Sequence, residues 1–111
     1  MDDKLNALDK LIEAVEAGTA GTDECSVAFP SLEYDGTLTW RMAWDAYNGD
    51  LNAFSKFLNM LLPGWRARLD IGRRNRCWVI SPDNQKTDAY GSNPARSGFL
   101  AILRAYRSVQ A

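Results

Sequence analysis

The spacing of apolar residues changes period part-way along this chain of 111 residues, and that change restricts its fold most. Four stretches place apolar residues at helical spacing: 3–17, 38–47, 51–62 and 94–108. Residues 65–71 instead alternate apolar and charged side chains, which is typical of a strand with one buried face. A second apolar run at 76–80 follows a turn that contains Gly72, so the two runs predict an antiparallel hairpin.

These elements predict one α+β domain over residues 1–111, in the order α-loop-α-α-β-β-α, with the hairpin packed on helices. Residues 18–37 are predicted to be a loop, because they are rich in glycine, proline and small polar residues. Within that loop, residues 26–29 form a candidate extended piece. A lone hairpin is only marginally stable, and residues 26–40 are the candidate source of a third strand. The residues after the hairpin, through Gly91, are predicted to be a polar loop.

Three segments of the chain resemble the phage ABA-sandwich domain family of small tailed-phage and prophage proteins. They are LDKLIEAVEAG at 8–18, AYNGDLNAFSKFLNMLLPGW at 46–65 and YGSNPARSGFLAILRAYRS at 90–108. Each segment marks a structural boundary, and none is a catalytic signature. The resemblance implies a small α/β/α sandwich and a phage-encoded accessory protein, and it identifies no substrate. Residues 19–45 show no correspondence to the family.

The composition removes many kinds of active site. The chain has no histidine, which excludes the commonest general base, the usual nucleophile triads and most catalytic zinc sites. It also lacks the glycine-rich loops that bind phosphates or dinucleotides. Its two cysteines are expected to be reduced, with Cys77 a small core residue of the second strand and Cys25 far from it in the sequence. We therefore expect no enzyme activity, no cofactor and no metal site.

Charge is distributed unevenly along the sequence. Residues 1–37 hold nine acids and two lysines, a net of −7, whereas residues 63–111 hold nine bases and three acids, a net of +6. Such asymmetry can create two faces with different partners. Alternatively the two halves neutralise each other in the folded protein, which is the interpretation that we favour.

The predicted hairpin concentrates positive charge beside aromatic residues. Its candidate partner-binding residues are Arg66, Arg68, Arg73, Arg74, Arg76 and Trp78. Arginine and tryptophan are favoured anchors at protein interfaces, and they also suit phosphate contact with base stacking. We rank a protein partner ahead of nucleic acid, because a dedicated nucleic-acid binder is usually basic whereas this chain has a net charge of −1. The simpler alternative is that these arginines pair with the acidic N-terminal half.

Two further groups of residues are candidates for partner binding. Trp40 and Trp44 share one face if residues 38–47 are helical, where they either pack in the core or as a lid over the sheet, or form an exposed aromatic anchor or the wall of a small pocket. An acidic patch is predicted in the long loop, where carboxylates could imitate nucleic-acid phosphates or simply be solvated: Asp23, Glu24, Glu33 and Asp35. No spacing of metal ligands supports a cation site there.

The leading hypothesis is a non-enzymatic phage accessory protein that binds a macromolecular partner, in its concrete form an anti-CRISPR-like inhibitor of a host defence complex. The alternatives are a small-molecule-sequestering protein or minor enzyme with a pocket between Trp40, Trp44 and the sheet, or a nucleic-acid-contacting module. No apolar run reaches the roughly 20 residues that span a bilayer. The acidic start is unlike a signal peptide, so we expect a location in the host bacterial cytoplasm without membrane contact. The sequence leaves monomer and homodimer open.

Overall fold

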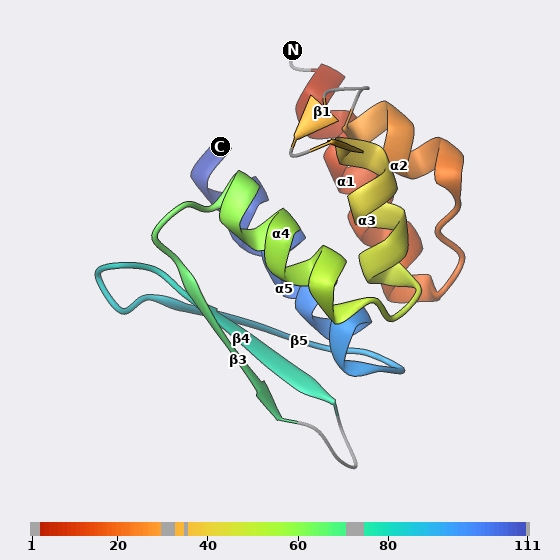
Figure 1. Ribbon diagram of the computed structural model, residues 1–111. Coiled ribbons are helices and arrows are strands. Elements are labelled where there is room, and N and C mark those ends of the chain that lie inside the picture. The colour runs from red at the N-terminus through yellow and green to blue at the C-terminus, as the bar shows by residue number, and fades with distance from the viewer. Residues whose placement is uncertain (1–2, 30–32, 35, 71–74, 111) are drawn as a thin grey trace.

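The computed structural model describes residues 3–29, 33–34, 36–70 and 75–110 and forms a small α+β domain (Figure 1). Its helices are α1 (Asp3–Ala17), α2 (Thr22–Ala28), α3 (Thr39–Tyr47), α4 (Leu51–Leu61) and α5 (Pro94–Gln110). Its strands are β1 (Glu33–Tyr34), β2 (Thr37–Leu38), β3 (Arg66–Asp70), β4 (Arg76–Ile80) and β5 (Lys86–Tyr90). The predicted class, the four predicted helices and the antiparallel hairpin are confirmed.

Helix α5 is the centre of the domain. It contacts β4 and β5 on one side and α1, α3 and α4 on its other sides. Between Ala95 and Ala105 its side chains are buried on nearly every side of the helix, and Phe99 and Ile102 are fully buried. A helix that buries its whole circumference must be surrounded by other elements. Helix α5 therefore joins the sheet to the helices, and Figure 1 shows it lying across the sheet beside α4.

The main sheet has the order β3-β4-β5 with both pairs antiparallel. Its inner row, which includes Cys77, Val79 and Ala89, is buried in the core under α5. The opposite row carries mostly charged side chains, and the described helices lie on the inner side (Figure 1). The helices pack against one side of this sheet, because charged outer positions give a further helical layer no apolar surface to cover.

Residues 22–28, predicted to lie in a loop, form helix α2. The Glu24 carboxylate accepts a hydrogen bond from the Gly21 backbone N–H at 2.8 Å, which stabilises the first turn. Cys25 is fully buried and anchors the helix to the core. The extended piece predicted at 26–29 is therefore wrong, since residues 26–28 are helical. A single buried side chain in seven residues shows too little periodicity for the helix to be recognised.

The third strand of the main sheet comes from β5 and not from residues 26–40. Residues 33–34 and 37–38 pair only with each other, as the separate two-stranded sheet β1-β2. Strand β5 has the sequence KTDAY, in which only Ala89 is buried. Because its outer positions need no apolar residue, the alternation that identifies a strand is weak, and the segment was predicted to be a polar loop.

Candidate partner-binding face

The side chains on the outer side of the main sheet form a surface that we call the open sheet face. The strand register sets them in rows, with Arg68, Trp78 and Asp88 side by side across β3, β4 and β5. The neighbouring row consists of Asp70, Arg76 and Tyr90. The complete face comprises Arg66, Arg68, Asp70, Arg76, Trp78, Ile80, Lys86, Asp88 and Tyr90. Ile80 is buried and the other side chains are exposed or half-buried, so most of the face is accessible to a partner.

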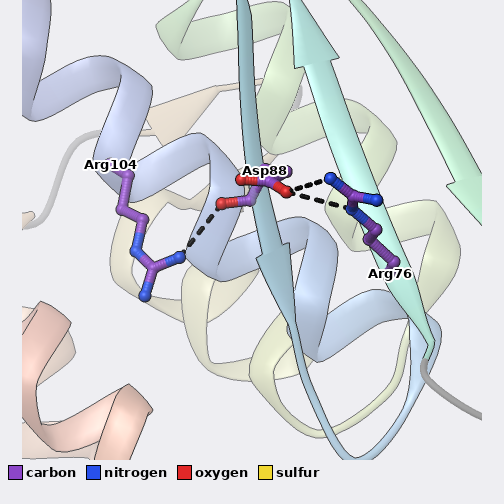
Figure 2. A network of polar contacts seen from close by, with 3 residues as sticks. All are labelled: Arg76, Asp88 and Arg104. Atoms are coloured by element: carbon purple, nitrogen blue, oxygen red, sulfur yellow. Dashed lines mark hydrogen bonds and ion pairs between the residues drawn. The ribbon is translucent and has the colours of Figure 1, made fainter.

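Arg76 organises the centre of the open sheet face. Its Nε and Nη2 atoms lie 3.0 and 2.5 Å from Oδ2 of Asp88, on the adjacent strand (Figure 2). Its guanidinium carbon lies 4.3 Å from the ring centroid of Trp78 and 5.4 Å from that of Tyr90. A planar guanidinium can pair with a carboxylate through its edge and stack on aromatic rings through its faces. Arg76 therefore holds both rings in fixed positions.

Arg66 and Arg68 lie on the same face with their charge uncompensated. Arg66 donates from Nη2 to the amide oxygen of Asn84 at 3.0 Å, and the guanidinium carbon of Arg68 lies 5.8 Å from the Trp78 ring centroid. Within the part of the chain that the structure describes, neither arginine has a carboxylate within 4.0 Å. The described face carries four bases and two acids, so its net charge is +2.

The acidic N-terminal segment is partly neutralised by α5 and not by the described hairpin arginines. Arg104 pairs with Glu16 at 2.6 Å, and Arg107 pairs with Asp9 at 2.7 Å, which joins α5 to α1. The favoured interpretation of the charge asymmetry therefore holds for these two helices. The positive charge of β3 is left available for another molecule.

The structure brings four of the predicted hairpin residues onto one face: Arg66, Arg68, Arg76 and Trp78. Arg73 and Arg74 lie outside the described residues. The prediction missed Asp88 and Tyr90, because β5 was not recognised as a strand. The alternation of Lys86, Asp88 and Tyr90 around buried Ala89 is the signal that could have identified both.

Trp40 and Trp44 do not join the open sheet face. Both lie on α3, which packs on α2, α4 and α5. Both are half-buried against the core, and the Trp44 ring stacks on Tyr47 with centroids 5.8 Å apart. Tyr47 in turn contacts the Arg96 guanidinium, whose carbon lies 3.9 Å from its ring centroid. These tryptophans thus pack against the core among helices, which agrees with the core-packing alternative and not with a lid over the sheet.

The predicted acidic patch is only partly described. Asp23 is exposed in the first turn of α2, and Glu24 caps that turn. The side chain of Glu33, and Asp35 as a whole, lie outside the described residues. Asp23 and Glu24 border a shallow hollow of about 230 Å³ between α1 and α2, beside the exposed Val27. Among the residues that the structure describes, no three potential metal ligands lie together.

A second hollow, of about 420 Å³, lies between the end of α1 and the connection from β5 to α5. Two arginines line it, and both are already held by the protein. Arg96 donates to the Tyr47 carbonyl at 2.8 Å and to the Ser92 hydroxyl at 3.0 Å. Arg104 donates to the Asp88 carbonyl at 3.0 Å and pairs with Glu16. Through these contacts the guanidinium groups of Arg96 and Arg104 stabilise the fold.

Both cysteines are buried, and burial controls their chemistry. Desolvation raises the pKa of Cys77 to about 12, and desolvation together with the charge of Glu24 raises the pKa of Cys25 to about 12. A thiol must lose its proton to act as a nucleophile. At neutral pH neither residue supplies a thiolate, so the protein's two cysteines do not provide a nucleophile.

Comparisons of the chain with protein-family models, with curated proteins and with solved structures found no match. The family resemblance therefore rests on the three sequence segments alone. None of the helices that the structure describes is both long and apolar enough to cross a bilayer.

Proposed function

We propose that this protein is a non-enzymatic binding module whose open sheet face recognises an acidic surface on a partner protein. The observation that supports this most is the pair Arg66 and Arg68, exposed and without a described carboxylate partner, with Arg68 beside Trp78. Unpaired guanidinium groups next to aromatic rings can form new ion pairs with a partner without first losing internal ones.

The rigidity of this face also favours binding. Ordering a flexible side chain at an interface costs about 0.5–1.5 kcal/mol. Trp78 and Tyr90 are already positioned by Arg76, which Asp88 holds in turn. Most of the entropic cost of ordering Trp78 and Tyr90 therefore arises when the protein folds and not when a partner binds. Arginine, tryptophan and tyrosine are also the residues that most often dominate the energy of an interface.

The overall charge supports a protein partner over nucleic acid. The chain has a net charge of −1, whereas the described open sheet face has a net charge of +2. A nucleic acid extends beyond such a small patch and meets the remaining acidic surface, which repels it. A compact acidic patch on a protein meets only the arginines. If a single-stranded nucleic acid binds instead, its affinity will fall steeply with added salt and Trp78 will be its stacking platform.

Affinity capture tests the proposal. The tagged protein is used to capture partners from bacterial host cells, in parallel with a variant carrying Arg66→Ala, Arg68→Ala and Trp78→Ala. We expect the triple variant to lose at least about 100-fold in affinity, because central interface residues of these types often contribute 2 kcal/mol or more each.

The control variant carries Lys10→Ala and Arg41→Ala, which remove two positive charges from α1 and α3. It should capture as the wild type does. Equal capture by the wild type and the triple variant would show that the open sheet face is not the binding site.

The more specific hypothesis, a phage accessory protein that inhibits a host defence complex, stays a prediction. It requires the captured partner to be a subunit of such a complex, with an acidic surface that fits the open sheet face. Expressing the chain in a host with an active defence should then restore plaque formation by a sensitive phage. The triple variant should not restore it.

A further inference from the structure

Strand β3 presents an edge that no described strand covers. The sheet order β3-β4-β5 leaves β3 paired with β4 on one side only. A free edge exposes backbone N–H and C=O groups that can pair with another strand. Strand β3 is five residues long and reads RARLD, with Ala67 and Leu69 half-buried and the other three residues exposed.

The opposite edge of the sheet, at β5, is covered by contrast. The backbone carbonyl of Asp88 accepts a hydrogen bond from Nη1 of Arg104 at 3.0 Å, and Figure 2 shows Arg104 reaching it from α5. The same guanidinium pairs with Glu16, so the end of α1 lies close to this edge. An incoming strand would have to displace Arg104 from the Asp88 carbonyl. The edge available for pairing is therefore that of β3.

The sequence of β3 is complementary to itself. In an antiparallel pair, residues directly opposite each other lie on the same face of the sheet. If two copies pair with Leu69 opposite Leu69, Arg68 of each copy faces Asp70 of the other. Neither Arg68 nor Asp70 has an ion-pair partner among the described residues. Pairing of two copies would give Arg68 and Asp70 an ion-pair partner each.

Neighbouring registers place like charges together. Centring the pair on Arg68 forms two Arg66–Asp70 pairs but sets Arg68 against Arg68, and centring it on Ala67 sets Arg66 against Arg68 twice. Centring it on Asp70 sets two carboxylates against each other. Like charges directly opposite each other on adjacent strands are destabilising. Among these registers, the one centred on Leu69 pairs opposite charges without a like-charge pair, so the charges of β3 favour it.

We propose that a second copy of this chain is the occupant of the β3 edge, paired antiparallel about Leu69 to form a continuous six-stranded sheet. The twofold axis runs perpendicular to the sheet, so the open sheet faces of both copies lie side by side on one surface. The two Leu69 side chains contact each other on the inner side of the sheet. Each of them is only half-buried in a single copy. This inference goes beyond the proposed function, because a single open sheet face can bind a partner.

Disulfide cross-linking tests the register. A Leu69→Cys variant should form a disulfide-linked dimer under mild oxidation, because the two positions are opposite neighbours. An Ala67→Cys variant should not, because its two thiols are separated by four residues along the paired strands. Both variants are made in a Cys77→Ala background, because Cys77 lies directly opposite Leu69 on β4 and could otherwise form a disulfide within one molecule. A failure of Leu69→Cys to cross-link, or equal cross-linking of Ala67→Cys, would overturn the proposal.

Charge reversal tests the pairing without new thiols. Arg68→Glu sets Glu against Asp70 of the second copy, and Asp70→Lys sets Lys against Arg68, so each variant should sediment as a monomer at concentrations where the wild type is a dimer. Mixing the two variants should restore a dimer, because every opposite pair is then of opposite charge. Sedimentation of the wild type as a monomer at all concentrations, or no dimer in the mixture, would refute the inference.

Sedimentation and partner capture of the wild type separate this inference from the proposed function. A wild type that dimerises but captures no partner would support the dimer and reject the proposed function. Partner capture by a wild type that is always monomeric would leave the proposed function standing and reject the dimer.

Discussion

At the residue scale, the arrangement around Arg76 explains how charged and aromatic side chains share a small surface. Asp88 accepts from the edge of the guanidinium, while Trp78 and Tyr90 lie within stacking distance of it. Arg66 and Arg68 have no comparable partner among the described residues. One arginine of the sheet is thus held by an ion pair, whereas two have no carboxylate partner among the described residues.

The buried cysteines predict a dependence of stability on alkaline pH. Because folding raises the pKa of each thiol from 9.0 to about 12, the folded state keeps protons that the unfolded state loses in that interval. The stability from this source is fully present below pH 9 and is lost as the pH rises toward 12. The free energy of unfolding, measured in urea, should therefore decrease from pH 9 upward.

A variant with Cys25→Ala and Cys77→Ala is the control for this effect. It should show a shallower decrease over the same pH range, because the other titrating groups are unchanged. Identical slopes for the variant and the wild type would contradict the assignment to the thiols.

At the element scale, the contact between α4 and α5 depends on a glycine. A Cβ atom at Gly98 would lie 2.4 Å from Cε1 and 2.7 Å from Cδ1 of Phe54, whose ring is buried in the core. Alanine in place of glycine usually stabilises a helix interior by about 1 kcal/mol. Here the added methyl group must displace a packed ring, and such overpacking typically costs about 1–3 kcal/mol.

We therefore expect Gly98→Ala to lower the free energy of unfolding by about 1–2 kcal/mol, which reverses the usual sign. Urea titration followed by circular dichroism measures it. Gly21→Ala is the matched control, because its Cβ would meet only the Glu24 carboxylate at 3.5 Å and its φ of −127° suits any residue. Unchanged or increased stability of Gly98→Ala would show that α4 and α5 are not packed this closely.

The elements that the sequence predicted well are those with a strong apolar period. Helices α1, α4 and α5 repeat large apolar residues over three or more turns, and β3 alternates without interruption. Helix α2 and strand β5 each bury a single residue, so neither produces a period. Their formation depends on tertiary contacts, Cys25 in the core and Ala89 under α5, which a local pattern does not contain.

The residues of the candidate site divide in the same way, into those on strands that the sequence predicted and those on β5, which it did not predict. The alternation of β3 already placed Arg66 and Arg68 on one face, and the structure adds Arg76 and Trp78 through the register of β4. Tyr90 could not be found without recognising β5. The role of Trp44 was undecidable from its spacing, because a helical face can turn toward the sheet or toward other helices.

At the scale of the whole molecule, the uneven charge of the sequence has two outcomes. Ion pairs between α1 and α5 use Asp9, Glu16, Arg104 and Arg107 inside one molecule. The charge of β3 remains on the far side of the sheet from these helices. A chain with a net charge of −1 thereby keeps a local positive face, as the proposed binding of an acidic partner requires.

The most direct test of this account uses the four tryptophans of the chain as separate reporters. Their indole N–H signals, assigned by single substitution, are followed by NMR while the captured partner is added to the labelled protein. Binding at the open sheet face predicts that the Trp78 signal shifts while those of Trp40 and Trp44 stay in place. Shifts of Trp40 and Trp44 with an unchanged Trp78 would place the binding site on α3 and contradict the account.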